Sequence, residues 1–315
     1  MIEWLLSALG LCILLLAGDA LVRGAVNLSL RLGVPAMIVS LTIVAFGTSA
    51  PELLIAVSAI KDNAPGIALG NVVGSNTANI LLVLGIPAML SALHTSQCQS
   101  RKNYVVMLLA SVVFIALAFW GTFTLVSGLI LLTMLALFLA DNMRDAHAHH
   151  KAGECVDLDE IEEADPDMPY WRVAIYLVIG LIGLPIGAHL LVENASLIAR
   201  TYGISDTVIG LTLVAVGTSL PELATTVMAA LRRQADVALG NVIGSNIFNL
   251  LAIVGIATFI GEIPVDPAFL RLDLWVMLAA SLLLIPFVFF KVDITRIWGV
   301  ALTALYAIYV VFILS

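Results

Sequence analysis

Gly47-Thr48-Ser49-Ala50-Pro51-Glu52 places a proline and an ionisable carboxylate in the middle of a long apolar run, and the pattern returns as Gly217-Thr218-Ser219-Leu220-Pro221-Glu222. A charge in hydrocarbon costs at least ~2.5 kcal/mol on insertion scales, so a carboxylate at such a place indicates a functional site. Because the pattern occurs twice, the rest of the chain is interpreted as a scaffold that brings the two copies together.

The composition is that of an integral membrane protein. Of the 315 residues, 61% are hydrophobic and 11% are charged, and the mean hydropathy is +1.09, whereas soluble domains carry roughly 25% charged residues. The net charge of -8 says little about the membrane part, because acidic residues gather in one segment, residues 154–167. No basic patch indicates a nucleic-acid partner, so the lipid bilayer is the expected surrounding.

The apolar stretches predict ten membrane spans, since a helix needs about 20 apolar residues to cross a bilayer. A polar break divides the chain into a first five-helix repeat (1–141), an acidic loop (142–169) and a second five-helix repeat (170–315). The expected spans are 2–29, 36–60, 66–91, 103–120, 123–141, 170–199, 207–231, 237–260, 272–290 and 295–314.

An internal repeat links the two halves. Sliding the chain by 170 residues aligns 41–86 with 211–256 without a gap, and 24 of these 46 pairs are identical. Each unit holds five spans, an odd number, so the second unit enters the membrane from the opposite side. This is the inverted-repeat architecture of secondary transporters. The predicted fold is an all-α membrane protein of ten transmembrane helices in two inverted five-helix repeats, with the proline-broken second and seventh spans at its centre.

The distribution of Lys and Arg predicts the orientation. In the ten-span arrangement 11 of these residues fall on one side of the membrane and three on the other. The richer side is expected to be cytoplasmic. Both termini of a multi-pass cell-membrane protein are therefore expected outside, and the acidic loop inside.

The first and sixth spans are long. About 28 residues at ~1.5 Å each give ~42 Å, against a hydrocarbon thickness of ~30 Å, so both spans are expected to be tilted. Each carries a polar pair four residues apart at matched positions, Asp19 with Arg23 and His189 with Glu193. We interpret these as local ion pairs near the interface, with a role in gating or ion entry as the alternative.

Pro51 should interrupt its helix. It has no N–H to bond the carbonyl of Gly47, and its ring crowds that turn, so carbonyls near residues 45–47 are expected to be freed. In lipid, freed backbone groups need a partner or a wet cavity. A bound cation is one such partner, and Pro221 repeats the arrangement.

Oxygen-bearing side chains accompany each proline. Thr48, Ser49 and Glu52 share one face of a helix, because residues three and four apart are neighbours. Hard cations such as Ca2+ take six to eight oxygen ligands, and these helices lack the Cys or His that would favour zinc or copper. Two carboxylates balance one divalent or two monovalent cations. The second copy supplies Thr218, Ser219 and Glu222.

The following helix in each repeat adds a second polar face. Small residues four apart, Gly70 with Gly74 and Gly240 with Gly244, permit close helix packing. Asn79 and Asn249, near mid-helix, are interpreted as lining the site. The faces consist of Asn71, Ser75 and Asn79 and of Asn241, Ser245 and Asn249, and helix–helix hydrogen bonds are expected from Asn71, Asn76, Asn241 and Asn246.

These residues leave several functions open. An antiporter fits the repeat inversion, and its counter-ion is either Na+ or H+. A cation channel or an ion-sensing scaffold would use the same site. An enzyme is not expected, because neither a nucleophile–base pair nor a phosphate loop occurs.

The repeated motifs resemble those of the calcium/cation antiporter superfamily, in which Gly-Thr-Ser-x-Pro-Glu is followed by Gly-Asn-x-x-Gly-Ser-Asn. The resemblance covers nearly the whole chain and is strongest to the prokaryotic sodium/calcium exchanger branch. The proton/calcium branch typically has Gly-Asn-Ala-Ala-Glu at the carboxylate, which this chain lacks. The resemblance implies exchange of Na+ for Ca2+ by alternating access, with no cofactor beyond the transported ions, while the first and sixth spans slide across the others.

The resemblance also implies a set of ligands. The chain departs from some archaeal and potassium-dependent relatives at Asn249, where those have Asp, and the amide removes one titratable charge. The implied cation ligands are Glu52, Glu222, Thr48, Ser49, Thr218, Ser219, Ser75, Asn79, Ser245, Asn249 and the carbonyls of Ala45 and Ala215.

Overall fold

A computed structural model describes residues 2–152, 165, 167–203 and 215–314. The described chain is dominated by helices, and its two short strands, β1 (Thr122–Phe123) and β2 (Ile263–Pro264), pair antiparallel. The helices before the acidic segment are α1 (Ile2–Leu32), α2 (Ala36–Val39), α3 (Ala45–Thr48), α4 (Ala50–Lys61), α5 (Pro65–Ala78), α6 (Gly85–Leu90), α7 (Arg101–Ala118) and α8 (Leu125–Ala152), with a 3-10 turn at Thr95–Gln97.

The described residues after the acidic segment are also mostly helical. Their helices are α9 (Tyr170–Thr201), α11 (Ala215–Gly217), α12 (Leu220–Leu231), α13 (Ala235–Phe248), α14 (Val254–Ala257), α15 (Pro267–Arg271), α16 (Asp273–Leu282), α17 (Ile285–Phe289) and α18 (Arg296–Leu314). Within the described residues, three π-helical turns interrupt the central helices, at Ser40–Val44, Asn79–Val83 and Asn249–Ile253.

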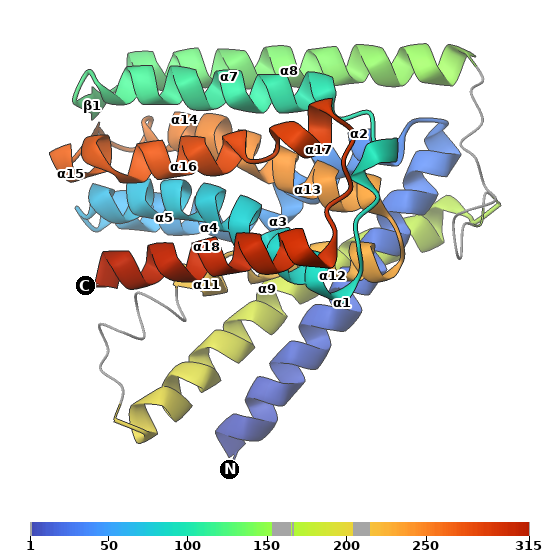
Figure 1. The fold of residues 1–315 in the computed structure, drawn as a ribbon, viewed down its shortest axis with the longest axis horizontal. Helices are drawn as coiled ribbons and strands as arrows, with labels where there is room; N and C mark the ends of the chain where they lie inside the picture. Colours follow the sequence, from blue (N-terminus) through green and yellow to red (C-terminus); the bar gives the residue numbers. More distant parts are fainter. Residues whose placement is uncertain (1, 153–164, 166, 204–214, 315) are drawn as a thin grey trace.

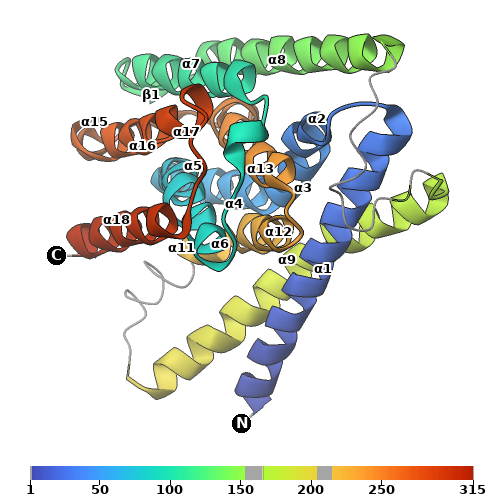
Figure 2. The same cartoon turned by 45° about the vertical axis from the view of Figure 1, so that its right-hand side comes forward.

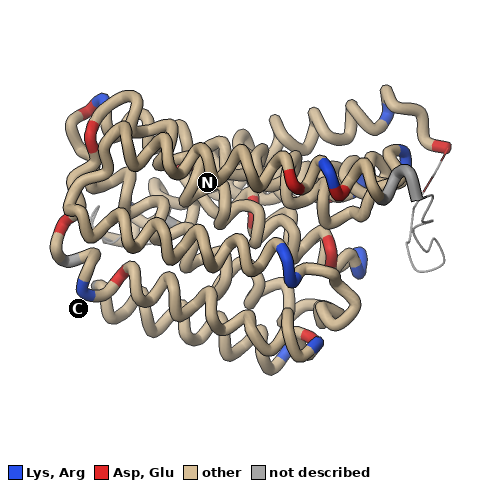
Figure 3. The backbone as a smooth tube through the Cα atoms, turned by 90° about the horizontal axis from the view of Figure 1, so that it is seen from above, with Lys and Arg blue, Asp and Glu red and all other residues tan. Residues whose placement is uncertain are grey.

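The described helices match the expected spans. Eight are long and apolar enough to cross a membrane, and α2–α3 with α4 forms a ninth span bent by 40°. The remaining expected span, 207–231, contains α12 and the short α11, while its residues 207–214 lie outside the described part of the chain. Figure 3 shows most charged residues toward the two ends of the long helices, as a bilayer requires.

The central helices are those that carry the second polar face. In the span Ala235–Ala257 the apolar window is 100% buried, and in Pro65–Leu90 it is 78% buried, whereas the window of the outer span Arg296–Ile313 is 11% buried. A Cβ on Gly244 would lie 2.6 Å from the Cβ of Ala45 and 2.7 Å from the carbonyl oxygen of Leu41. The expected close packing is therefore confirmed for α13 against α3.

Two long helices lie at an angle to this bundle. Figures 1 and 2 show α1 and α9 running side by side across it. Their backbones meet at Gly10 and Gly187, where a Cβ on either glycine would lie 2.9 Å from the carbonyl oxygen of the other. They contain 31 and 32 residues, about 47 Å at 1.5 Å per residue, which agrees with the expected length.

The polar pairs on these helices form as expected. Arg23 Nε lies 3.0 Å from Asp19 Oδ2, and His189 Nε2 lies 3.5 Å from Glu193 Oε2. The structure adds a partner that the sequence did not predict, because Asp19 Oδ1 also pairs with Arg232 just beyond α12. This contact ties α1 to the bundle.

The acidic loop begins later than expected. Helix α8 continues to Ala152, past the span end predicted at residue 141. Lys102 on α7 pairs with Asp141, at the predicted span end, and with Asp145 on the extension, and these contacts favour helix beyond the apolar run. Most of the acidic segment, residues 153–164 and 166, lies outside the described residues.

Candidate cation site

Both Thr-Ser-x-Pro-Glu stretches break their helices at the serine. Ser49 has φ −85° and ψ 4°, and Ser219 has φ −86° and ψ 4°. Each proline then occupies the first turn of the next helix, where its missing N–H leaves no bond unmade. The expected proline breaks are confirmed, and each places a glutamate at a helix N-terminus, which favours a carboxylate.

The carboxylate of Glu222 contacts the helix break of the first repeat, at Ser49. Ser49 Oγ donates a hydrogen bond to Glu222 Oε1 at 3.1 Å, and the side chains are 3% and 0% exposed. Glu222 Oε2 is buried without a hydrogen-bond partner among the described residues. The residues are 173 positions apart in the sequence, so the tertiary fold brings the two repeats together here.

Glu52 lacks even one such bond. Its side chain is 1% exposed, and neither carboxylate oxygen has a hydrogen-bond partner in the described parts of the chain. A buried carboxylate is costly unless it is paired, neutralised or bound to a cation. This arrangement suits a group that receives a cation.

The threonine hydroxyls reach across to the other repeat in the same way. Thr48 Oγ1 donates to Asn241 Oδ1 at 3.3 Å, and its counterpart Thr218 Oγ1 donates to Asn71 Oδ1 at 3.4 Å. Thr48 also lies 3.4 Å from Ser245 Oγ. The break of each repeat is thus held against the second polar helix of the other, which confirms interhelical roles for Asn71 and Asn241.

The carbonyl expected as a ligand in the first repeat is engaged in hydrogen bonds. Ala45 O accepts from the N–H of Ser49 at 3.1 Å, and it lies 3.3 Å from Thr48 Oγ1, whose single proton it shares with Asn241 Oδ1. The expectation of a freed carbonyl is therefore wrong at Ala45, because Ser49 still supplies the regular helical donor before the break. Ala215 begins α11, directly after the undescribed residues 204–214.

The remaining expected ligands lie on the central helices. Ser75 is 3% exposed, and Ser245 is fully buried. Asn79 and Asn249, 1% and 0% exposed, each begin a π-helical turn. Such turns recur at functional sites because they redirect side chains from the regular helical face. The sequence did not predict these turns, and the paired Asn residues at matched positions were its only signal.

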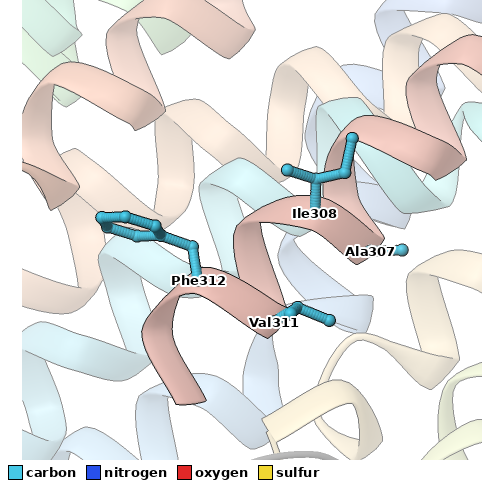
Figure 4. Close-up of a pocket in the computed structure, with 4 residues that line it drawn as sticks. All are labelled: Ala307, Ile308, Val311 and Phe312. Atoms are coloured by element: carbon cyan, nitrogen blue, oxygen red, sulfur yellow. The ribbon is translucent and has the colours of Figure 1, made fainter. Parts of the chain in front are cut away.

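The chemistry of this cluster is that of a hard-cation site. No group of three or more His, Cys, Asp or Glu in the described chain is arranged to hold a metal. Buried hydroxyl and amide side chains instead accompany the two carboxylates on the same and on contacting helices, and oxygen is the ligand type that Ca2+ prefers. The surface hollow in Figure 4 lies elsewhere, on the outer face of α18. Its lining, Ala307, Ile308, Val311 and Phe312, is apolar and supplies no side-chain ligand for a cation.

The broken helices and the buried carboxylates define a membrane ion transporter. The comparisons with known proteins then give the family. The family model described as sodium/calcium exchanger protein matches residues 2–142 and 172–315, and the chain belongs to this family.

Several relatives cover most of the chain. A putative antiporter CaxA from Alkalimonas amylolytica is 37% identical over 88% of this chain and 86% of its own. A sodium/calcium exchanger MaX1 from Methanosarcina acetivorans is 34% identical over 98% of both chains. The solved structure of the sodium-calcium exchanger NCX_Mj, soaked with Na+ and Sr2+, has a TM-score of 0.83 at 33% identity and covers 99% of this chain and 98% of its own.

Proposed function

We propose that Glu52 and Glu222 hold the cations in the Na+/Ca2+ antiport that family membership assigns to this chain. One observation carries the proposal. Both carboxylates are at most 1% exposed, and three of their four oxygens have no hydrogen-bond partner in the described residues. Two negative charges can be balanced by one Ca2+ or by two Na+, so the same site accepts either load.

The surrounding oxygens complete the coordination. Ca2+ requires six to eight ligands, more than two carboxylates supply. The Ala45 carbonyl can join the set when the proton of the Thr48 hydroxyl goes to Asn241 alone and leaves one lone pair of the carbonyl for the cation. The proposed neutral ligands are Thr48, Ser49, Ser75, Asn79, Thr218, Ser219, Ser245, Asn249 and the carbonyls of Ala45 and Ala215.

The chain is a multi-pass membrane protein, and we place it in the cell membrane with both termini outside. The excess of Lys and Arg on one side supports this orientation. Transport is expected to need no cofactor besides the transported ions, and we assign no enzymatic activity.

Countertransport in proteoliposomes tests the proposal. Uptake of 45Ca2+ driven by an outward Na+ gradient should be lost in Glu52→Gln and in Glu222→Gln, because each substitution removes one of the two balancing charges. Glu262→Gln, on an exposed loop, is the matched control and should retain uptake.

Two other results would redirect the assignment. Uptake that ignores Na+ and follows an imposed pH gradient would support a cation/proton antiporter. A flux that neither saturates nor requires a counter-ion would indicate a channel. Full uptake in both glutamine variants would refute the site itself.

A further inference from the structure

Four buried asparagines occupy matched positions beside the candidate site. Asn76 lies in the last turn of α5, and Asn79 begins the π-helical turn that follows. Asn246 and Asn249 occupy the same two places in α13 and in the turn after it. All four are at most 1% exposed. A buried amide needs hydrogen-bond partners at both ends, so its partners decide which end faces the cation.

A chain of hydrogen bonds fixes the orientation of three of these amides. Asn76 Nδ2 donates to the carbonyl oxygen of Val72 at 2.7 Å, and Asn246 Nδ2 donates to the carbonyl oxygen of Asn76 at 3.3 Å. Backbone carbonyls only accept hydrogen bonds, so the atom facing each must be the amide nitrogen. Asn246 therefore has its Oδ1 atom available as an acceptor.

The last hydrogen bond of this series fixes the orientation of the Asn79 amide. Its Nδ2 donates to Asn246 Oδ1 at 3.0 Å. Because Asn246 Oδ1 can only accept, the nitrogen of Asn79 must face it, and the oxygen of Asn79 points elsewhere. That oxygen is buried and has no hydrogen-bond partner among the described residues. It is a neutral oxygen of the kind that Na+ and Ca2+ use.

We propose that Asn246 is a positioning residue that holds the Asn79 amide with its oxygen toward the transported cation. The inference rests on the proposed ligand role of Asn79. The two ends of an amide carry opposite partial charges, so rotation by half a turn would present an N–H donor, which repels a cation. Asn246 prevents this rotation and thereby keeps Asn79 a ligand.

The equivalent pair of asparagines, related to the first by the internal repeat, does not make the same hydrogen bond. Asn249 occupies the position equivalent to Asn79, and Asn76 the position equivalent to Asn246. Both amide atoms of Asn249 and the Oδ1 atom of Asn76 lack hydrogen-bond partners within the described chain. The repeat assigns Asn76 Oδ1 as the acceptor that orients Asn249. In the conformation described, the Asn79 amide is already oriented by Asn246. The Asn249 amide takes its orientation when a bound cation attracts its oxygen.

A double-mutant cycle tests the Asn246–Asn79 relationship. The variants are Asn79→Ala, Asn246→Ala and their combination, and the readouts are the KM for Ca2+, the KM for Na+ and the maximal exchange rate. Loss of an outer partner of a metal ligand weakens metal affinity by roughly 10–100-fold. We expect Asn246→Ala to raise both KM values about tenfold at that scale, and the double variant to match Asn79→Ala, because Asn246 acts only through Asn79.

An additive double variant would overturn the inference, because a purely structural role would act independently of Asn79. An unchanged KM in Asn79→Ala would overturn it as well, while leaving exchange at Glu52 and Glu222 intact. Asn246→Asp keeps an acceptor oxygen for the Asn79 amide and should retain a lower KM than Asn246→Ala. If Asn246→Ala fails to fold, a KM in Asn246→Asp as high as in Asn79→Ala overturns the proposal.

Discussion

Ser49 Oγ donates a hydrogen bond to Glu222 Oε1 at 3.1 Å, so the break in one repeat contacts the carboxylate of the other. The equivalent atoms, Ser219 Oγ and the Glu52 oxygens, have no hydrogen-bond partners in the residues that the structure describes. Two segments of matching sequence thus make different bonds. This inequivalence is expected of repeats that exchange roles between the two access states of a transporter.

Ser49→Ala should weaken Ca2+ binding. It removes a proposed oxygen ligand, and a polar contact with a charged group contributes about 1.5–3 kcal/mol. The KM for Ca2+ in proteoliposomes should therefore rise about tenfold or more. Ser58→Ala, at an exposed position of α4, the helix that follows Ser49, should leave the KM unchanged. Equal KM values in the two variants would contradict a role for the Ser49 hydroxyl.

Gly244→Ala should destabilise the contact between α13 and α3. Its added Cβ would lie 2.6 Å from the Cβ of Ala45 and 2.7 Å from the carbonyl oxygen of Leu41, and backbone cannot easily yield. Overpacking of this kind costs about 1–3 kcal/mol, visible as a lower apparent Tm in detergent. Gly66→Ala adds a Cβ with no described atom within 4 Å, and its Tm should stay close to that of the unmodified protein.

Asp19 and Arg232 should be energetically coupled. Their side chains are 20% and 16% exposed, so the pair is less screened than a surface pair. In a cycle of Asp19→Asn, Arg232→Gln and the double variant, we expect a coupling of about 0.5–3 kcal/mol in the apparent free energy of unfolding. The more exposed pair His189–Glu193, at 82% and 60% exposure, should show less. Additive effects for Asp19 and Arg232 would mean that the pair does not hold α1 against the bundle.

Asp293 should stabilise the loop contact between 91–100 and 290–295 in a pH-dependent way. Partial burial opposes the shift, but hydrogen bonds from the Ser96 N–H and from His94 outweigh it and lower the pKa of Asp293. A carboxylate with a lowered pKa contributes stability that is present above the unfolded pKa of about 3.9 and is lost as the pH falls through the folded value.

The measurement is the apparent Tm of Asp293→Asn and of the unmodified protein between pH 3 and pH 7. The difference between them should be constant near neutrality and should shrink below about pH 4. A difference that stays the same across this range would show that the charge of Asp293 adds nothing.

The sequence was sufficient for the features that depend on local pattern. Apolar run length predicted the spans, and the duplicated proline predicted that both helices are interrupted, because proline lacks the N–H that a continuous helix needs. The four-residue spacing of Asp19 and Arg23 predicted their ion pair, because residues four apart are neighbours on any helix. The resemblance of the two motifs predicted the family.

Contacts between distant segments were beyond the reach of these patterns. The pairing of Asp19 with Arg232 depends on how α1 crosses the bundle, and the occupied carbonyl of Ala45 depends on where the helix actually ends. The π-helical turns at Asn79 and Asn249 likewise have no local signal in propensity, since tertiary packing selects them.

The sequence by itself determined that two buried glutamates exist and that each follows a broken helix. Only the tertiary structure decided that the Ser49 hydroxyl donates to Glu222 while the Ser219 hydroxyl has no partner among the described residues, and that the amide nitrogen of Asn79 faces Asn246. The repeats have nearly the same residues at these places, so the sequence predicts equivalent halves. Their hydrogen bonds differ because one arrangement of the packed helices pairs Ser49 and Asn79 and leaves Ser219 and Asn249 without partners among the described residues.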